Sequence, residues 1–206
     1  MVIQGLRKVL GGHLVLDDLS LTASQGETIA LFGENGAGKS TLLRILAGVL
    51  DADGGRANLD EVSILGPNAT FRARVGYVPE AADAPAFLSP HELVQLVAAL
   101  KRANMPSQSL QDRLGVGPYW NRPIGGLSLG QRRRSCLLAA LIGEIRLLLL
   151  DEPTNGLDPT GVQELAQILL EQQESGTITL VATHDHAFSK LLAGREIRLV
   201  AGRITG

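Results

Sequence analysis

Residues 28–41 read TIALFGENGAGKST, in which a short apolar run leads directly into a glycine-rich turn. The turn matches the pattern G-x-x-x-x-G-K-[ST], with an expected strand at 28–32 before it and an expected helix at 39–47 after it. Glycines let backbone N–H groups turn inward around phosphate oxygens, and the helix presents the positive end of its dipole to the same anion. The sequence therefore predicts a phosphate site in a strand, turn and helix unit.

Two side chains of this predicted phosphate site carry specific chemistry. Lys39 adds a point charge for the outer phosphates, and Ser40 offers a hydroxyl to Mg²⁺. The expected nucleotide-binding residues are Gly33, Glu34, Asn35, Gly36, Ala37, Gly38, Lys39, Ser40 and Thr41. A merely flexible loop is the alternative, and the expected strand and helix on either side argue against it.

A second candidate site follows the four leucines at 147–150, which run directly into Asp151 and Glu152. Burial of the leucines in a strand places both acids at its carboxyl edge, where ligands bind in open α/β sheets. Asp151 is expected to hold Mg²⁺ through a water, and Glu152 to accept a proton from an attacking water. An ordinary polar turn after an apolar strand is the alternative, and the phosphate loop favours the functional interpretation.

The rest of the chain predicts an α/β fold whose middle part has helical patterns but no strand patterns. Expected strands are 2–9, 14–21, 28–32, 56–59, 62–65, 75–78, 147–150, 177–182 and 195–200, with Gly54, Gly55, Gly66 and Pro67 between some of them. Expected helices are 39–47, 90–102, 107–114, 131–142 and 161–174. This order favours a mainly parallel sheet, a small antiparallel layer and a helical insertion from 81 to 131.

Length, charge and cysteine content limit the function classes. The 206 residues are enough for one domain with a small insertion, and a net charge of −2 gives no reason to expect nucleic-acid binding. Residues 132–134 are three arginines, expected to form a solvated helix face. The single cysteine, Cys136, is expected to be a buried, inert thiol in a reducing compartment. No apolar stretch is long enough to cross a bilayer, so a separate polypeptide would supply any membrane part.

Three further segments resemble motifs of the ABC ATPase family. Residues 127–131 read LSLGQ, which is similar to the LSxGQ motif of that family and lies upstream of the acidic strand as it does there. We call residues 127–131 the LSLGQ segment; a simple helix cap by Ser128 is the alternative. Gly156-Leu157-Asp158 resembles the D-loop of the family, and His184 after the strand at 177–182 resembles its switch histidine.

The resemblance covers essentially the whole chain and implies a single ABC ATPase domain over residues 1–206. It implies a RecA-like P-loop NTPase core with its β layer at 1–80 and 137–206, and an inserted helical subdomain at 81–136. The implied activity is Mg²⁺-dependent hydrolysis of ATP in a head-to-tail dimer, either a homodimer or a pair with another ABC ATPase. Ser128, Gly130, Gln131 and Asp158 would contact a nucleotide held by the partner, and catalytic His184 would contact the γ-phosphate.

Two positions depart from the family pattern. Glu80 follows Val78-Pro79 where many relatives have Gln, and we expect it to ligate Mg²⁺ while adding a negative charge near the phosphates. Leu10 occupies the region where relatives usually stack an aromatic ring on adenine, with His13 as a possible substitute. We therefore expect a strong metal dependence and weak selectivity for the base.

The favoured function is an ATPase subunit that powers a separate integral membrane permease, whose coupling helix would enter a groove beside Glu80 and residues 85–92. Such a subunit would be cytoplasmic and peripheral at the inner face of the cell membrane, with no nucleic acid as partner. The sequence ends at Gly206 shortly after its last expected strand, which favours an export-type system. A soluble ABC ATPase, for example in iron-sulfur cluster assembly, is the alternative; a P-loop kinase would leave the LSLGQ segment and His184 unexplained.

Overall fold

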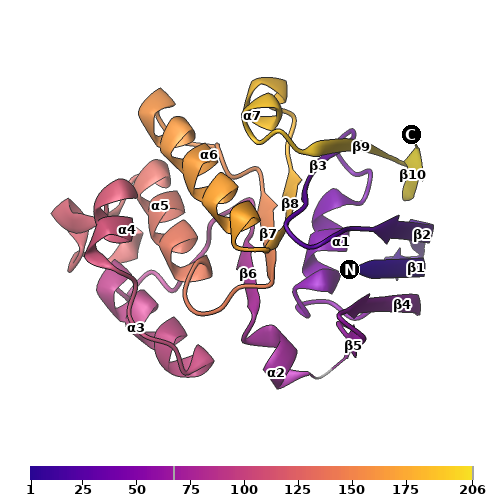
Figure 1. The fold of residues 1–206 in the computed structure, drawn as a ribbon, viewed down its shortest axis with the longest axis horizontal. Helices are drawn as coiled ribbons and strands as arrows, with labels where there is room; N and C mark the ends of the chain where they lie inside the picture. Colours follow the sequence, from indigo (N-terminus) through magenta and orange to yellow (C-terminus); the bar gives the residue numbers. More distant parts are fainter. Residues whose placement is uncertain (67, 206) are drawn as a thin grey trace.

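The computed structural model describes residues 1–66 and 68–205, and it arranges them around two β-sheets (Figure 1). The larger sheet has the strand order β10, β9, β3, β8, β7, β6. These strands are Arg203–Thr205 (β10), Arg195–Val200 (β9), Thr28–Phe32 (β3), Ile178–Ala182 (β8), Leu147–Asp151 (β7) and Val75–Val78 (β6). Every neighbouring pair is parallel except β10 with β9. The predicted mainly parallel sheet is confirmed.

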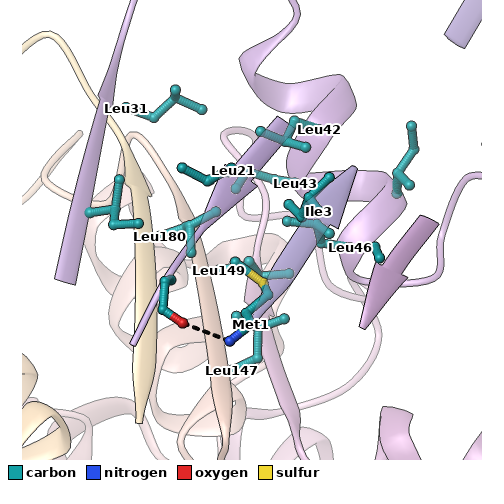
Figure 2. Close-up of a cluster of buried hydrophobic side chains, with 14 of the residues drawn as sticks. Met1, Ile3, Leu21, Leu31, Leu42, Leu43, Leu46, Leu147, Leu149 and Leu180 are labelled. Carbon is teal, nitrogen blue, oxygen red and sulfur yellow. Dashed lines mark hydrogen bonds between the residues drawn. The ribbon is translucent and has the colours of Figure 1, made fainter. Parts of the chain in front are cut away.

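The smaller sheet is antiparallel and covers one face of helix α1 (Lys39–Leu46). Its order is β2, β1, β4, β5, and its strands are His13–Thr22 (β2), Val2–Leu10 (β1), Gly54–Leu59 (β4) and Val62–Ser63 (β5). Figure 2 shows Leu42, Leu43 and Leu46 of α1 in one apolar cluster with Ile3 of β1 and Leu149 of β7. The Met1 amino group donates to the Ala23 carbonyl at 2.6 Å. This is the small antiparallel layer that the sequence predicts beside the nucleotide-binding strand.

A second core fills the opposite face of the larger sheet, under α5 (Leu129–Ala140), α6 (Pro159–Glu174) and α7 (His186–Leu191). Successive side chains of a strand point to opposite faces, so Leu147 and Leu149 enter the core around α1 while Leu148 and Leu150 enter the core under α5. A strand buried on both faces explains why its sequence is an uninterrupted apolar run.

Between residues 81 and 128 the structure has helices and loops but no strand, as the sequence predicts. Helix α3 (Pro90–Lys101) begins with a capping box, in which Glu92 N–H donates to the Ser89 hydroxyl at 3.2 Å and Ser89 N–H donates to the Glu92 carboxylate at 2.8 Å. Helix α4 (Gln108–Arg113) and two short 3₁₀ turns, Gly117–Tyr119 and Ile124–Gly126, complete the insertion. Figure 1 shows α3 and α4 beside α5, on the far side from the antiparallel sheet.

The sequence did not predict three short elements: α2 (Ala69–Arg72), α7 and β10. They are only four, six and three residues long, too short for a hydrophobic period to be recognised. Local capping starts both helices, since Asn68 and Asp185 accept backbone N–H groups of Phe71 and Phe188 at 3.0 and 2.9 Å. Pro67, which we expected to mark a turn, lies outside the described residues, as does Gly206.

The prediction of a solvated arginine face at 132–134 is wrong. Arg133 is fully buried, and Arg132 and Arg134 are half-buried. The reason is the close packing of α5 on β6, where a Cβ added to Gly76 would lie 2.4 Å from the Ala140 carbonyl oxygen. The arginine on the inner face of α5 therefore points into the sheet, where backbone carbonyls accept its N–H groups.

Cys136 lies one turn further along α5 and is partly buried. Burial raises the pKa of its thiol to about 11, which suits the unreactive cysteine that the sequence predicts. Among residues 1–66 and 68–205, no helix combines the length and the apolar character needed to cross a membrane.

Candidate nucleotide site

The glycine-rich turn lies between β3 and α1 at the carboxyl edge of the larger sheet. Gly38 caps α1 with φ of 107°, and a Cβ there would lie 2.9 Å from both the Val15 carbonyl oxygen and a methyl of Leu16. Gly36 also has a positive φ, 82°, but a Cβ there would meet no atom within 4 Å. Gly38 is therefore required for close packing on β2, whereas the backbone at Gly36 borders open space that suits a phosphate group.

Lys39 is the first residue of α1, and its ammonium group points back over the turn. Its Nζ donates to the carbonyl oxygens of Gly33 at 2.7 Å and Glu34 at 3.2 Å. The side chain is largely buried, so it presents a fixed positive charge at the start of the helix. A helix N-terminus and a lysine thus lie on the same side of the turn, and both favour a negatively charged ligand.

Strands β6, β8 and β7 bring the remaining predicted side chains to the same edge, because parallel neighbours end together. Glu80 follows β6, Asp151 ends β7 with Glu152 directly after it, and His184 follows β8. A cleft of about 410 Å³ joins these residues to the glycine-rich turn. Its lining residues are Leu10, Val15, Asn35, Gly36, Gly38, Lys39, Ser40, Thr41, Glu80, Asp151, Glu152 and His184.

Asp151 at the end of β7 and Glu152 directly after it are buried, and burial raises the pKa of both carboxyl groups. The Ser40 hydroxyl and the Lys39 charge oppose this effect on the pKa of Asp151. For Glu152 the opposing group is His184, whose Nε2 lies 3.0 Å from Oε1 of the carboxylate and lowers its pKa. Glu152 has a φ of 47°, and its N–H donates to the Ala182 carbonyl at 2.8 Å. A left-handed backbone at a non-glycine residue is a feature that clusters at functional sites.

The described residues contain no cluster of three or more His, Cys, Asp or Glu side chains able to hold a metal ion by themselves. The cleft nevertheless offers oxygen donors, among them the Ser40 hydroxyl and the carboxylates of Asp151 and Glu80. Mg²⁺ prefers oxygen ligands and is commonly held by one or two carboxylates together with substrate phosphates. The donor set therefore fits Mg²⁺ held jointly with a nucleotide.

The cleft also has apolar lining residues. Leu10 and Val15 line it from the antiparallel sheet, and the lining side chains described by the structure include no Phe, Tyr or Trp. Leu10 thus lies where the sequence places it, whereas His13 does not reach the cleft lining. Val15 is a lining residue that we did not anticipate, since one valine in an alternating strand carries no distinguishing signal.

The LSLGQ segment and Asp158 are not among the residues that line this cleft. Ser128 caps α5 in a second capping box, because Gln131 N–H donates to its hydroxyl at 3.2 Å and the Gln131 side chain accepts from Ser128 N–H at 3.0 Å. A Cβ on Gly130 would lie only 2.2 Å from the Gly156 carbonyl oxygen. The LSLGQ segment therefore packs directly on the Gly156-Leu157-Asp158 turn.

Asp158 itself has two partners within the chain. Its carboxylate caps α6 by accepting Gly161 N–H at 3.3 Å, and it forms an ion pair with Arg134 of α5. The structure thus groups the predicted residues into two sets, one around the cleft and one at the start of α5 and α6.

Comparison with known proteins finds similar sequences among ATP-binding proteins of transport systems. Residues 16–155 match the family model described as ABC transporter. The lantibiotic transport ATP-binding protein SrtF of Streptococcus pyogenes is 32% identical over 187 residues, covering 88% of this chain and 79% of that protein. The cobalt import ATP-binding protein CbiO of Rhodobacter capsulatus is 35% identical over 209 residues, covering 94% of this chain and 72% of that protein.

Solved structures share the fold. An ATP-binding subunit of an ABC transporter superposes with a TM-score of 0.90 at 24% identity, covering all of this chain and 88% of that one. The ATP-binding cassette MJ0796, solved as a dimer in a post-hydrolysis state with ADP and Pi, gives a TM-score of 0.86 at 23% identity. This match covers 100% of this chain and 96% of that one. These similarities establish the architecture of the core, the antiparallel layer and the helical insertion.

Proposed function

This chain belongs to the ABC transporter family, and from that premise we propose that it binds ATP with Mg²⁺ and hydrolyses it to ADP and phosphate to power a separate membrane permease. The main support is the cleft, where the glycine-rich turn faces two buried acids and His184. A strand end that offers both a base and a metal-binding acid beside a phosphate receptor suits phosphoryl transfer to water.

We assign the roles of the cleft residues by their position. Residues 33–41 bind the phosphates through backbone N–H groups and Lys39. Ser40, Asp151 and Glu80 supply oxygen atoms for Mg²⁺, which when bound neutralises charge on the phosphate oxygens. Glu152 accepts the proton of the attacking water, and its raised pKa brings the carboxylate closer to the range in which a general base is effective. His184 orients this carboxylate through the 3.0 Å contact and reaches the outer phosphate.

The proposed active form is a head-to-tail dimer, formed with a second copy or another ABC ATPase. Ser128, Gly130, Gln131 and Asp158 lie outside the cleft of their own chain, although the start of α5 is a helix N-terminus that favours anions. Ser128, Leu129 and Asp158 are exposed and therefore free to meet a nucleotide held by another chain. A second copy in the opposite orientation would complete each cleft with these residues.

The proposed contact with the permease is a groove of about 260 Å³ beside the segment that follows β6. It is lined mainly by apolar side chains from β6, α3 and α5, including Tyr77, Leu93 and Val97. Phe87 lies between this segment and α3 and is 80% exposed. An apolar groove of this kind suits a short amphipathic helix, here a coupling helix of the permease. The chain would then work in the cytoplasm, peripheral at the inner face of the cell membrane.

We also propose the division into a core at 1–80 and 137–206 and a helical subdomain at 81–136, with α5 joining the two. The alternative function is a soluble ABC ATPase, as in iron-sulfur cluster assembly. The names of the relatives favour transport, since they include lantibiotic transport and the import of cobalt and of glutamate or aspartate.

The test is extraction of the tagged chain from its native membranes in mild detergent, followed by identification of the proteins that co-purify. We expect an integral membrane protein in defined stoichiometry, and ATPase activity that changes when this protein is present. Recovery of soluble partners alone would support the alternative and contradict the transport function.

A further inference from the structure

The buried Arg133 joins the carboxyl ends of two neighbouring strands. Its Nη1 donates to the Pro79 carbonyl at 2.8 Å and to the Asp151 carbonyl at 3.3 Å, and its Nη2 donates to the Glu80 carbonyl. The side chain has a relative exposure of 0%. One guanidinium therefore holds the backbone after β6 and the backbone at the end of β7 at the same time.

The position of Pro79 explains why the strands need this bridge. The last backbone pair between β6 and β7 is Val78 with Leu150. Pro79 has no N–H to donate, so it cannot extend the ladder toward Asp151. The planar guanidinium supplies donors where the sheet lacks them and bonds the carbonyl groups of both strands.

The surroundings of Arg133 offset part of the cost of burying its charge, although burial still lowers its pKa. The carboxylates of Asp151, Glu80 and Glu152 are near enough for their negative charge to act on the guanidinium. Cys136, three residues along the same face of α5, donates to the Ala82 carbonyl at 3.3 Å. This face of α5 thus holds the whole segment from 79 to 82, which carries Glu80, against the end of β7.

We propose that Arg133 is a positioning residue that fixes the distance between the backbones of Glu80 and Asp151, and so between two of the oxygen donors for Mg²⁺. The proposal rests on the proposed function, in which those two carboxylates hold the metal with the nucleotide. Arg133 lies on α5, the helix that begins in the LSLGQ segment. A shift of α5 would therefore move the backbones of both Glu80 and Asp151 through this one side chain.

Three variants test this role. Arg133→Met removes the donors and keeps an unbranched stem for packing. Arg133→Lys keeps the charge but not the planar fork that reaches two strands. The matched control is Arg132→Met, the adjacent position, whose guanidinium donates no hydrogen bond to either strand among the described residues. The measurements are Mn²⁺ binding followed by electron paramagnetic resonance in the presence of ADP, and binding of a fluorescent ATP analogue without metal.

We expect Arg133→Met to weaken Mn²⁺ binding about 10-fold or more, as is usual when a residue that supports metal ligands is lost. Arg133→Lys should be intermediate, and Arg132→Met should match the wild type. Metal-free binding of the ATP analogue should stay unchanged in all three variants, because the glycine-rich turn is not held by Arg133.

Two results would overturn the positioning role. One is wild-type Mn²⁺ affinity in Arg133→Met or Arg133→Lys; the lysine variant settles the question even if the methionine variant does not fold. The other is an equal loss of metal-free and metal-dependent binding, which would indicate general destabilisation. If the wild-type chain itself binds neither the ATP analogue nor Mn²⁺ with ADP, then the proposed function fails and not this inference alone.

Discussion

Nε2 of His184 lies 3.0 Å from Oε1 of Glu152, although the two residues are 32 positions apart in the sequence. They meet because β7 and β8 are parallel neighbours whose carboxyl ends coincide, with Asp151 paired to Ala182. Glu152 turns toward the histidine through its left-handed backbone, and its N–H bonds to the Ala182 carbonyl. The contact joins the proposed general base, Glu152, to the histidine that we propose orients its carboxylate.

Glu152→Gln should therefore abolish turnover without abolishing binding. The amide cannot accept the proton of an attacking water, and we expect kcat to fall about 10²- to 10⁴-fold. Because bound ATP is no longer consumed, the dimer should accumulate, which light scattering with and without ATP would detect. Glu144→Gln, an exposed substitution outside the cleft, is the control. A monomer with normal phosphate release would contradict the proposed dimer, in which each chain completes the nucleotide cleft of the other.

Much of this arrangement is predictable from the sequence. The glycine-rich turn carries a specific local pattern. The leucine run before Asp151 and the strand before His184 are weak patterns alone and gain their meaning from that turn, and parallel pairing brings the three strand ends together. The burial of Arg133 was not predictable in this way, because it depends on carbonyl acceptors from two strands distant in sequence. The one hint in the sequence was Pro79, whose missing N–H leaves the end of β6 without a donor for its neighbouring strand. The left-handed backbone of Glu152 has no sequence signature, since glycine is the usual residue for that conformation.

Glu80 provides a prediction about the metal. As a carboxylate it contributes a charged oxygen to the cleft, whereas glutamine would contribute a neutral one. We expect Glu80→Gln to raise the Mg²⁺ concentration for half-maximal ATPase activity about 10-fold, since ligand charge tunes the affinity of such sites. Glu61→Gln, an exposed substitution away from the cleft, should leave it unchanged. An unaltered Mg²⁺ requirement in Glu80→Gln would rule out a role for this carboxylate as a ligand.

The apolar residues of the cleft lining predict weak discrimination between bases. Leu10 and Val15 offer contact but no aromatic face, so the wild-type chain should turn over ATP and GTP with similar kcat/KM. Leu10→Tyr adds a ring, and stacking of a base on an aromatic side chain contributes about 1–3 kcal/mol, which corresponds to an affinity gain of roughly 5-fold or more. Leu14→Tyr places the same ring on an exposed position of β2 as a control. A strong preference for ATP in the wild type would count against this interpretation.

Gly130 should be sensitive to the smallest possible change. A methyl group there would lie 2.2 Å from the Gly156 carbonyl oxygen, so Gly130→Ala must separate the LSLGQ segment from the turn that carries Asp158. We expect a loss of about 1–3 kcal/mol in the free energy of unfolding, and weaker ATP-dependent dimer formation. The control is Gly126→Ala, where an added Cβ meets nothing within 4 Å. Equal stability and equal dimer formation in the two variants would show that the close packing is dispensable.

Lys101 should make the folded chain more stable as the pH rises above about 8, because its folded-state pKa is lowered. Within residues 1–66 and 68–205, its Nζ donates to two backbone carbonyls, Val75 at 2.9 Å and Ile142 at 3.1 Å, and burial lowers its pKa from 10.5 to about 8. Below pH 8 both the folded and the unfolded states hold the proton, so this residue contributes no pH dependence. Between about pH 8 and 10.5 only the unfolded state holds it, and the free energy of unfolding contributed by Lys101 rises with pH.

Urea unfolding of the wild type and Lys101→Met at pH 7, 8.5 and 10 measures this contribution. Because tyrosines and Cys136 titrate in the same range, the informative quantity is the difference in the free energy of unfolding between the two proteins. Below pH 8 that difference should be constant. Above pH 8 the free energy of unfolding of the wild type should rise relative to that of Lys101→Met. Lys190→Met, at an exposed position on α7, should show no such change. Parallel curves for the wild type and Lys101→Met would mean that the Lys101 ammonium keeps its ordinary pKa in the folded chain.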